Sequence, residues 1–347
     1  MTRACRRVLV TGAQGFTGRY LTRHWLAQDE AVRVIGIGRS PERTDTFAHR
    51  ISWRGRSLDA PLPPALRPAD PGRYVYQRVD LVETDAVARL LAQERVDTVV
   101  HLAASLRDEP FDLLVRNNVV ALQSLCAAAV QAARPELRIV VCSSGSVYGR
   151  VPDEALPTTE DWPPTPVDLY AVTKRAGEDV ASLYRRRHDL DVVIARIFNV
   201  IGAGEDERHL PPFLARQFAE RRRAVATTPI AVGPLDTTRD LVDVDDVAVA
   251  LVLIATHAAP GDVVNVASGT ESPIQSVFDV LAELSGDSEA AIDRRPARRA
   301  DVPRQWADIR RLKALGFTPK YTLRDSLHAV LRYYLDDVAG ATERKPR

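Results

Sequence analysis

Three glycines between a β-branched run and a helical pattern limit this chain to a small set of folds. Gly12, Gly15 and Gly18 follow the run Arg7–Val10 and lie at the start of the apolar stripe of Thr17–Ala27. This spacing is typical of a dinucleotide-binding turn: the first glycine turns the chain, the second admits the pyrophosphate and the third packs the helix on the sheet. The helix N-terminus then stabilises the phosphate charge. The residues predicted to hold the dinucleotide are Thr11, Gly12, Gln14, Gly15, Phe16, Thr17 and Gly18.

Strand patterns alternate with helical patterns up to residue 198. The expected strands are Arg7–Val10, Val32–Ile37, Tyr74–Val79, Thr98–Leu102, Arg138–Cys142 and Asp191–Phe198. The expected helices between them are Thr17–Ala27, Glu83–Glu94, Phe111–Ala133 and Tyr170–His188. Such alternation predicts an α/β fold with a Rossmann-like doubly wound parallel sheet.

The rest of the chain predicts a smaller, mixed C-terminal substrate domain built from separate segments. We expect residues 1–198, plus about 239–268, to form the dinucleotide-binding domain. Residues 199–238 and 269–338 form the substrate domain in this division, and 339–347 a flexible tail. Its expected elements are helices Pro212–Arg222, Ile274–Leu284 and Leu323–Leu335; a further strand, Val263–Ala267, is expected to return to the sheet. Ser40–Arg73 is proline-rich and is interpreted as a long surface insertion, with a flap near the adenosine end of the cofactor as the alternative.

Composition excludes several classes of partner. The formal net charge is +1, which gives no general attraction to nucleic acid or to an anionic membrane. The three cysteines, Cys5, Cys126 and Cys142, are too scattered for a disulfide scaffold or a metal site, so no metal is predicted. No apolar run is interpreted as long enough to cross a membrane. We therefore expect a cytoplasmic protein that binds neither nucleic acid nor membrane.

The residues after the second predicted strand distinguish two forms of the cofactor. An acidic residue there would bind the ribose 2′-hydroxyl of NAD, whereas an arginine suits the 2′-phosphate of NADP. Gly36–Ser40 contains no acid, and Arg39 and Ser40 can both donate to a phosphate. NADP(H) is favoured, and NAD(H) is the alternative. Further residues predicted to lie beside the cofactor are Asp80, which could equally be a helix N-cap, Leu81, Leu102, Ala103 and Ala104.

A tyrosine and a lysine four residues apart supply the chemistry of carbonyl reduction. The ordinary tyrosine pKa of about 10 makes the phenol a poor proton donor at neutral pH, and a nearby ammonium favours the phenolate. Tyr170 and Lys174 lie on one face of a predicted helix that Asp168 can cap. Ser144, at the end of the fifth predicted strand, can hydrogen-bond the reacting oxygen. These three residues are the predicted catalytic group.

The motifs together resemble those of the extended short-chain dehydrogenases/reductases that modify nucleotide sugars, the NAD-dependent epimerase/dehydratase family. Thr11–Gly18 matches the family pattern T-G-x-x-G-x-x-G, and Ser143–Gly149 matches S-S-x-x-V-Y-G. The resemblance implies Ser144 as the catalytic serine and Tyr170 as the acid/base. It implies that Lys174 also holds the nicotinamide ribose, and that Asn118 is a structural asparagine beside the cofactor site.

The resemblance extends to the C-terminal half and implies a nucleotide-diphosphate sugar as substrate. Asn199, Arg239 and Arg298 match family residues that bind the diphosphate, and His209 lies near a substrate-side histidine of some members. The family also pairs two long helices across a dimer interface. The resemblance therefore implies a homodimer.

The same resemblance leaves the reaction open among relatives. Gly145 and Ser146 stand where 4,6-dehydratases carry an acid pair, so elimination of water is disfavoured. The stretches Val232–Asp240 and Arg299–Pro303 resemble 4-ketoreductases of GDP-linked 4-keto-6-deoxyhexoses. A 4-epimerase using the same residues is the alternative, with a 4,6-dehydratase and a non-catalytic dinucleotide-sensing protein behind it.

Overall fold

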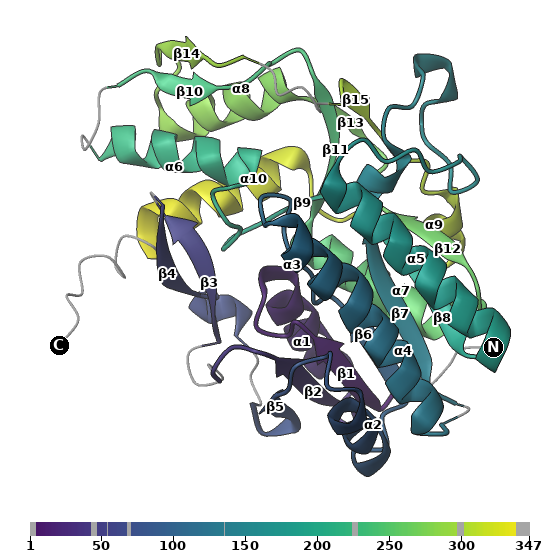
Figure 1. The fold of residues 1–347 in the computed structure, drawn as a ribbon. Helices are drawn as coiled ribbons and strands as arrows, with labels where there is room; N and C mark the ends of the chain where they lie inside the picture. The colour runs from purple at the N-terminus through teal and green to yellow at the C-terminus, as the bar shows by residue number, and fades with distance from the viewer. Residues whose placement is uncertain are drawn as a thin grey trace.

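Seven parallel strands form the central sheet, in the order β12-β8-β7-β6-β1-β2-β5 (Figure 1). The computed structural model describes residues 5–42, 47–53, 55–67, 71–134, 136–223, 228–296 and 302–337. The strands of the sheet are β1 (Arg7–Thr11), β2 (Arg33–Gly38), β5 (Tyr74–Arg78), β6 (Thr98–His101), β7 (Arg138–Ser144), β8 (Asp191–Ile197) and β12 (Val263–Val266). Every neighbouring pair is parallel, which confirms the predicted Rossmann-like doubly wound sheet.

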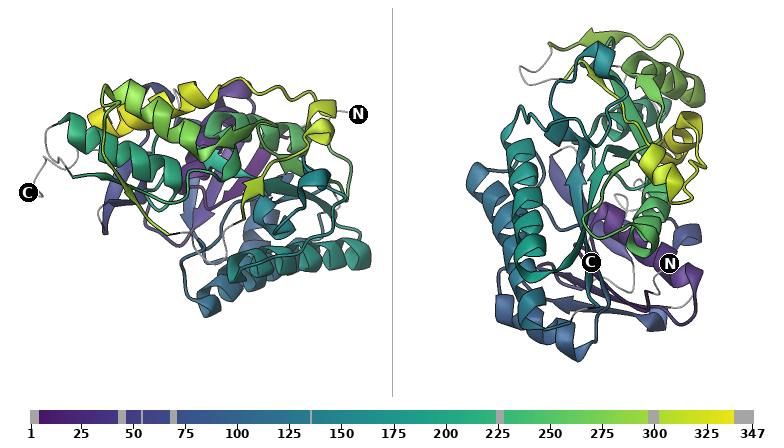
Figure 2. Two further views of the ribbon diagram at one scale, coloured as in Figure 1. Left: turned by 90° about the horizontal axis from the view of Figure 1, so that it is seen from above. Right: turned by 90° about the vertical axis from the view of Figure 1, so that its right-hand side faces the viewer.

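Helices cover both faces of this sheet (Figure 2). On one face lie α1 (Phe16–Gln28) and α7 (Val244–His257). On the other lie α2 (Thr84–Gln93), α4 (Ala121–Gln131) and α5 (Leu169–His188). Alternate strand residues pack on opposite faces of the sheet: Val8 and Val10 on the face of α1 and α7, and Leu9 on the face of α2, α4 and α5. Because both faces are buried, the inner strands are mostly apolar runs in the sequence.

The predicted helix over 111–133 is one continuous helical segment whose middle turn is π-helical. It comprises α3 (Phe111–Val115), a π-helical turn (Arg116–Val120) and α4. We expected no apolar run of membrane-spanning length, and that expectation is wrong, because Phe111–Gln131 is long and apolar enough by length and composition. Within this segment, half of the most apolar stretch of 18 residues is buried inside the protein. Its C-terminal part, α4, packs against α2 and α5. A core helix has the same length and composition.

A second hydrophobic core joins the C-terminal helices. α6 (Leu210–Arg222), α8 (Ile274–Ser285) and α10 (Leu323–Arg332) pack on one another, and α10 continues into a π-helical turn (Tyr333–Asp337). These helices confirm three of the predicted ones. The short strands nearby are β9 (Asn199–Ile201), β10 (Ile230–Val232), β11 (Thr238–Asp243), β13 (Glu271–Pro273), β14 (Ile292–Arg294) and β15 (Arg304–Gln305), and a short helix is α9 (Arg310–Ala314). The expected tail, 339–347, lies outside the described residues.

The interpretation of Ser40–Arg73 as a surface insertion is wrong for its central part. Strands β3 (Ala48–Trp53) and β4 (Arg56–Pro61) form an antiparallel hairpin, followed by 3-10 turns at Pro64–Leu66 and Pro71–Arg73. Ile51 and Ala60 enter the second core, and the buried His49 Nε2 lies 2.5 Å from the carbonyl oxygen of Gly204. The hairpin thus packs between the sheet and the C-terminal helices, because one of its faces is apolar.

Candidate active site at the carboxyl edge of the sheet

The predicted site residues come together because the parallel strands end at one edge. β1 ends at Thr11, which is in register with Ile37 of β2 and with His101 of β6. β7 ends at Ser144, in register with Ile197 of β8. In open α/β sheets this edge, beyond the carboxyl ends of the strands, is where ligands bind.

The glycine loop forms a tight cradle over this edge. Gly12 has a φ of +70°, and a Cβ added there would stand 3.0 Å from the backbone nitrogen of Ala103. A Cβ on Gly15 would lie 3.1 Å from the Gly12 carbonyl oxygen, and one on Gly18 would collide with the same oxygen. Gly15 is the N-cap of α1 and supplies no side chain to the first-turn amides. A cradle without Cβ atoms that leads to an uncapped helix N-terminus fits a dinucleotide pyrophosphate.

The other predicted loop residues divide into backbone and side-chain roles. The Gln14 side chain is buried and donates to the Pro41 carbonyl oxygen at 2.7 Å, while its amide oxygen accepts from Arg19 at 3.1 Å. The Thr11 hydroxyl lies 2.9 Å from His101 Nδ1 and accepts from the Ala103 amide at 3.1 Å. Phe16, Thr17 and Gly18 form the first turn of α1. Protein contacts thus fix Gln14, and Thr11 ties the loop to the end of β6.

The predicted adenosine-side residues lie at the ends of β2, β5 and β6. Arg39 and Ser40 follow β2 and are exposed. Asp80 is not the N-cap of α2, which is Glu83; instead its Oδ2 accepts from Arg116 at 2.8 Å. The remaining predicted residues also follow β5 or β6 near this edge. Leu81 is buried, Leu102 and Ala103 are half-buried, and Ala104 is exposed.

Tyr170 and Lys174 lie in the first turns of α5. Asp168 is the N-cap of this helix, as predicted, and its carboxylate accepts from the Ala171 amide at 2.8 Å. Lys174 Nζ donates to the Cys142 carbonyl oxygen of β7 at 2.6 Å. The Arg107 guanidinium lies 5.8 Å from the centre of the half-buried Tyr170 ring and forms an ion pair with Asp168 at 3.2 Å. The Tyr170 ring thus lies near one cation, Arg107, and one helical turn before a second, Lys174.

Ser144 faces a pocket between the sheet and the C-terminal region. The 3-10 turn Gly145–Tyr148 follows β7, and within it Ser146 donates to Ser144 Oγ from its amide at 3.2 Å and from its hydroxyl at 3.0 Å. The residues around the pocket are Arg107, Ser144, Ser146, Val167, Asp168, Ile197, Phe198, Asn199, Arg239, Val302 and Gln305. Tyr170 is not among them; it follows Asp168 by two residues in the first turn of α5, and Arg107, which does line the pocket, lies over its ring.

The predicted substrate-side residues are only partly brought together. Asn199 and Arg239 both line the pocket, and the Asn199 amide donates to Asp240 O at 3.1 Å and to Gln305 Oε1 at 3.0 Å. His209 does not line it; this exposed residue is the N-cap of α6, 4.0 Å from the Glu205 carboxylate. Arg298 lies outside the described residues.

Asp240, which follows Arg239 in β11, has a structural role. Asp240 is fully buried and accepts hydrogen bonds from the Ser268 amide at 2.8 Å, the Ser268 hydroxyl at 2.6 Å and the Gly269 amide at 3.0 Å. Burial raises the pKa of Asp240 to about 6 in spite of these donors. The aspartate thus fixes the loop after β12 to β11, which carries Arg239 into the pocket.

A buried polar network supports the serine segment from behind. Ser143 donates to Glu178 at 2.6 Å, and Arg196 forms a bidentate pair with the same carboxylate at 3.0 and 2.8 Å. The Arg196 guanidinium lies 4.8 Å from the centre of the Tyr148 ring. Sequence reasoning missed Glu178, although its position four residues after Lys174 places it on the same helix face.

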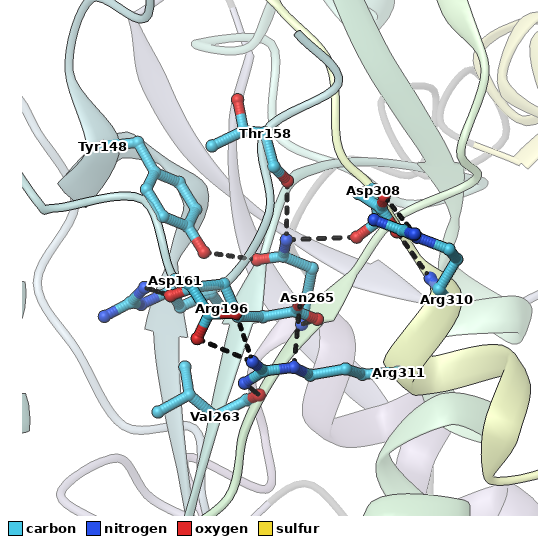
Figure 3. A network of polar contacts seen from close by, with 10 residues as sticks. Tyr148, Thr158, Asp161, Arg196, Val263, Asn265, Asp308, Arg310 and Arg311 are labelled. Atoms are coloured by element: carbon cyan, nitrogen blue, oxygen red, sulfur yellow. Dashed lines mark hydrogen bonds and ion pairs between the residues drawn. The ribbon is translucent and has the colours of Figure 1, made fainter. Parts of the chain in front are cut away.

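Figure 3 shows how this network reaches the loop before α5. Tyr148 donates to the Asn265 amide oxygen at 2.7 Å, and the Asn265 amide nitrogen donates to Thr158 O at 3.0 Å. The backbone amide of Asn265 donates to Glu160 at 2.9 Å. In the sequence, the adjacent acids Glu160 and Asp161 suggest a solvated acidic turn, but the Glu160 side chain is buried, and burial raises its pKa.

Two other groups near the site take no part in proton transfer at neutral pH. Burial raises the pKa of Cys142 to about 12, so the thiol stays protonated. Burial, with the added charge of Lys174, lowers the pKa of His101 to about 3, so the imidazole stays neutral. Both side chains are buried at the ends of their strands, β7 and β6.

Comparison with known proteins supplies the family context. Residues 8–267 match the model of the NAD dependent epimerase/dehydratase family. A GDP-6-deoxy-D-mannose reductase of Pseudomonas aeruginosa is 31% identical over 337 residues, covering 94% of this chain and 96% of the relative. A UDP-glucose 4-epimerase of Mycolicibacterium smegmatis is 32% identical over 335 residues, covering 94% and 98%.

Solved structures give the same picture. RMD from Pseudomonas aeruginosa complexed with NADPH has a TM-score of 0.76 and 29% identity, covering 95% of this chain and 99% of the other. UDP-glucuronic acid 4-epimerase from Bacillus cereus, in complex with UDP-glucuronic acid and NAD, has a TM-score of 0.77 and 27% identity, covering 94% and 98%.

Proposed function

The chain belongs to the NAD dependent epimerase/dehydratase family, and we propose that within it the chain is a 4-ketoreductase of a nucleotide-linked 4-keto-6-deoxyhexose. As a member, it is an NAD(P)-dependent enzyme of the extended short-chain dehydrogenase/reductase type that acts on nucleotide sugars. In the proposed reaction, hydride adds to the C4 carbon, a proton adds to the C4 oxygen, and the ketone becomes a secondary alcohol.

The observation that carries this proposal is the scarcity of carboxylates around the pocket. Among the described residues that line it, Asp168 is the single carboxylate, and that group caps α5 and pairs with Arg107. Ser146 stands where elimination of water would need an acid, and its hydroxyl is bonded to Ser144. A pocket of this kind supports carbonyl reduction better than dehydration.

In the proposed mechanism, each catalytic residue has one task. NADPH, when bound over the glycine loop, supplies the hydride. Tyr170 donates the proton to the C4 oxygen, and the Lys174 ammonium one turn along favours the resulting phenolate. Ser144 donates a hydrogen bond to the same oxygen and holds it in place. Lys174 would also hold the nicotinamide ribose. Asn118 would brace the cofactor side of the site: its side-chain oxygen accepts from the Ser105 amide at 2.8 Å, and its side-chain nitrogen donates to the Thr173 hydroxyl at 3.0 Å.

In the proposal, the substrate diphosphate lies on the side of the pocket that β9 and β11 form. Arg239 and Asn199 would donate to its oxygens, and charge-assisted hydrogen bonds of this kind are strong. Arg298 and His209 are kept as further substrate contacts in the proposal. We also propose that the two parts of the chain divide as the sequence predicts, with the sugar nucleotide held between them.

NADP(H) is the proposed cofactor, with NAD(H) as the alternative. Arg39 and Ser40 lie exposed after β2, with no acid in Gly36–Ser40. Asp80, Leu81, Leu102, Ala103 and Ala104 would line the adenosine and nicotinamide halves. We place the enzyme in the cytoplasm, where NADPH and nucleotide sugars are available.

A panel of 4-keto-6-deoxysugars linked to GDP, dTDP and UDP tests the reductase proposal. Each substrate is mixed with the purified protein and NADPH or NADH, and the nicotinamide absorbance is followed. We expect loss of absorbance with at least one sugar and faster loss with NADPH. No loss with any sugar and either cofactor would reject the reductase.

A 4-epimerase is the second candidate, because it would use the same Ser144, Tyr170 and Lys174 and because the relative from M. smegmatis bears that name. An epimerase returns the hydride to the sugar and leaves the cofactor unchanged. Protein purified with tightly bound NAD, and conversion of a 4-hydroxyl nucleotide sugar without net absorbance change, would favour this alternative.

We propose a homodimer formed through α3, α5 and the turn between α3 and α4. Large apolar side chains are exposed on these elements, and α3 contacts α5. They are Phe111 (48%), Leu113 (36%), Val120 (41%), Leu169 (54%), Val172 (43%) and Leu183 (37%).

Charged substitutions on α5 are expected to separate the dimer. In the double variant Val172→Glu/Leu183→Glu, two carboxylates would be buried in an apolar interface, and the molecular mass measured by light scattering should halve. Val75→Glu, at a still more exposed apolar residue on the edge strand β5, is the control and should leave the mass unchanged. A monomeric wild-type protein, or a double variant of unchanged mass, would contradict this interface.

A further inference from the structure

Arg78 ends β5 next to the segment that the sequence connects with the cofactor. It is in register with Gly38, the last residue of β2, and its Nε donates to the carbonyl oxygen of Arg39 at 2.9 Å. Both arginine side chains are exposed. Two strands therefore deliver two guanidinium groups to the same corner of the carboxyl edge.

Three hydrogen bonds from β5 and the residue after it hold the backbone of this corner. Besides the bond from Arg78, the Val79 amide donates to Gly38 O at 3.0 Å, and Tyr76 Oη donates to Ser40 O at 3.0 Å. A Cβ on Gly38 would stand 2.9 Å from that phenol oxygen, so glycine lets the tyrosine approach. Residues 38–40 are thus fixed before any ligand binds, which lowers the entropic cost of binding.

The two arginines carry charge that the described part of the chain does not neutralise by an ion pair. The carboxylate of Asp80, two residues after Arg78, is paired with Arg116 at 2.8 Å. Partial burial alone would raise the pKa of Asp80, but the hydrogen bonds from Arg116 and the Val82 amide and the charges of Arg116 and Arg39 lower it, so the acid is ionised and already bound. Neither Arg39 nor Arg78 pairs with a carboxylate among the described residues. The local field is therefore positive.

We propose that Arg78 is a specificity-determining residue that, together with Arg39, binds the phosphomonoester on the adenosine ribose of NADP(H). Its Nε donates to the Arg39 carbonyl oxygen, and no acceptor in the described part of the chain binds its terminal guanidinium nitrogens, which can therefore turn to the phosphate. Two guanidinium groups match a group that carries nearly two negative charges at neutral pH. The inference rests on the proposed preference for NADP(H) and adds to it a residue on a different strand.

Binding of half-cofactors tests this role without any sugar or turnover. Calorimetry would give the dissociation constants of adenosine 2′,5′-bisphosphate and adenosine 5′-monophosphate for the wild type and for Arg78→Met. We expect the wild type to bind the bisphosphate about 30-fold more tightly, and Arg78→Met to reduce this ratio about tenfold with the monophosphate constant unchanged. Arg39→Met should reduce the ratio similarly, and Arg78→Lys should retain part of it because it keeps the charge.

The control removes the same charge from the opposite end of the neighbouring strand. Arg33 is the exposed first residue of β2, and Arg33→Met should leave the ratio unchanged. A wild type that binds both ligands equally, or an Arg78→Met variant with an unchanged ratio or an equal loss for both ligands, would overturn the assignment. Failure of the proposed reductase would appear instead as absent turnover with the ratio intact, so the two failures are distinguishable.

Discussion

Tyr170→Phe should lower kcat by about a thousandfold, because the variant lacks the proton that the C4 oxygen needs. The phenylalanine ring keeps the packing of the tyrosine ring beneath Arg107, and Lys174 keeps its bond to the Cys142 carbonyl oxygen. The dissociation constant of NADPH should therefore change less than about threefold. Steady-state rates with the best nucleotide ketosugar and a fluorescence titration of NADPH give the two values.

The same helix offers a matched control for this substitution. Tyr184 also lies on α5, and its hydroxyl accepts a hydrogen bond from Gln123 at 2.7 Å, away from the pocket. Tyr184→Phe loses one partly buried hydrogen bond and should keep wild-type turnover. If Tyr170→Phe turned over within about tenfold of the wild type, Tyr170 would not be the proton donor.

Arg196→Met should be the most destabilising single change near the site. Glu178 is 1% exposed and Arg196 is 3% exposed, so the variant leaves a carboxylate buried without its bidentate partner. Removing one partner of a buried ion pair costs about 3–5 kcal/mol. Urea unfolding of the wild type and the variant measures the change in the free energy of unfolding.

Two further variants separate the buried pair from charge effects in general. Arg175 also contacts Glu178, at 3.1 Å, but its side chain is 35% exposed, so Arg175→Met should cost no more than about 1 kcal/mol. The double variant Arg196→Met/Glu178→Leu removes both charges and should recover most of the lost stability. A double variant as unstable as Arg196→Met alone would show that lost packing, and not the buried carboxylate left without Arg196, accounts for the loss.

Local sequence signals predicted the sheet and the cofactor loop. The inner strands of the sheet are buried on both faces, so each is a short, mostly apolar run that can be recognised without knowing its neighbours. The glycine loop and the Asp168 cap are also local, because a turn and a helix end are set by a few adjacent residues. Ser144 follows a predicted strand, and Tyr170 and Lys174 lie on the next long predicted helix. These local signals were enough to place the three residues on adjoining elements, β7 and α5.

Features that depend on contacts far apart in the chain were missed. Gln305 reaches the pocket only because the two-residue strand β15 pairs with β11, and a strand of that length has no periodicity. The proposed role of Arg78 in binding the cofactor follows only from its register with Gly38, which the sequence does not show. Glu160 is buried because Asn265 binds it, and nothing in its neighbourhood in the sequence indicates this.

The hairpin β3–β4 shows a different reason for failure. The prolines of Ser40–Arg73 suggested irregular surface chain, but Ile51 and Ala60 place one face of the hairpin on the second core, while Arg50 is exposed. Turn residues mark where regular structure is interrupted, and they do not show what the segments between them pack against.

Deuterium transfer tests the central claim most directly. NADPH carrying deuterium at C4 of the nicotinamide, prepared as each stereoisomer, is incubated with the enzyme and the most active nucleotide 4-keto-6-deoxysugar, and the product is analysed by mass spectrometry and NMR. The reductase account predicts one deuterium at C4 of the sugar from one of the two stereoisomers, with matching consumption of NADPH. A product without deuterium from either isomer, formed while NADPH is not consumed, would contradict it.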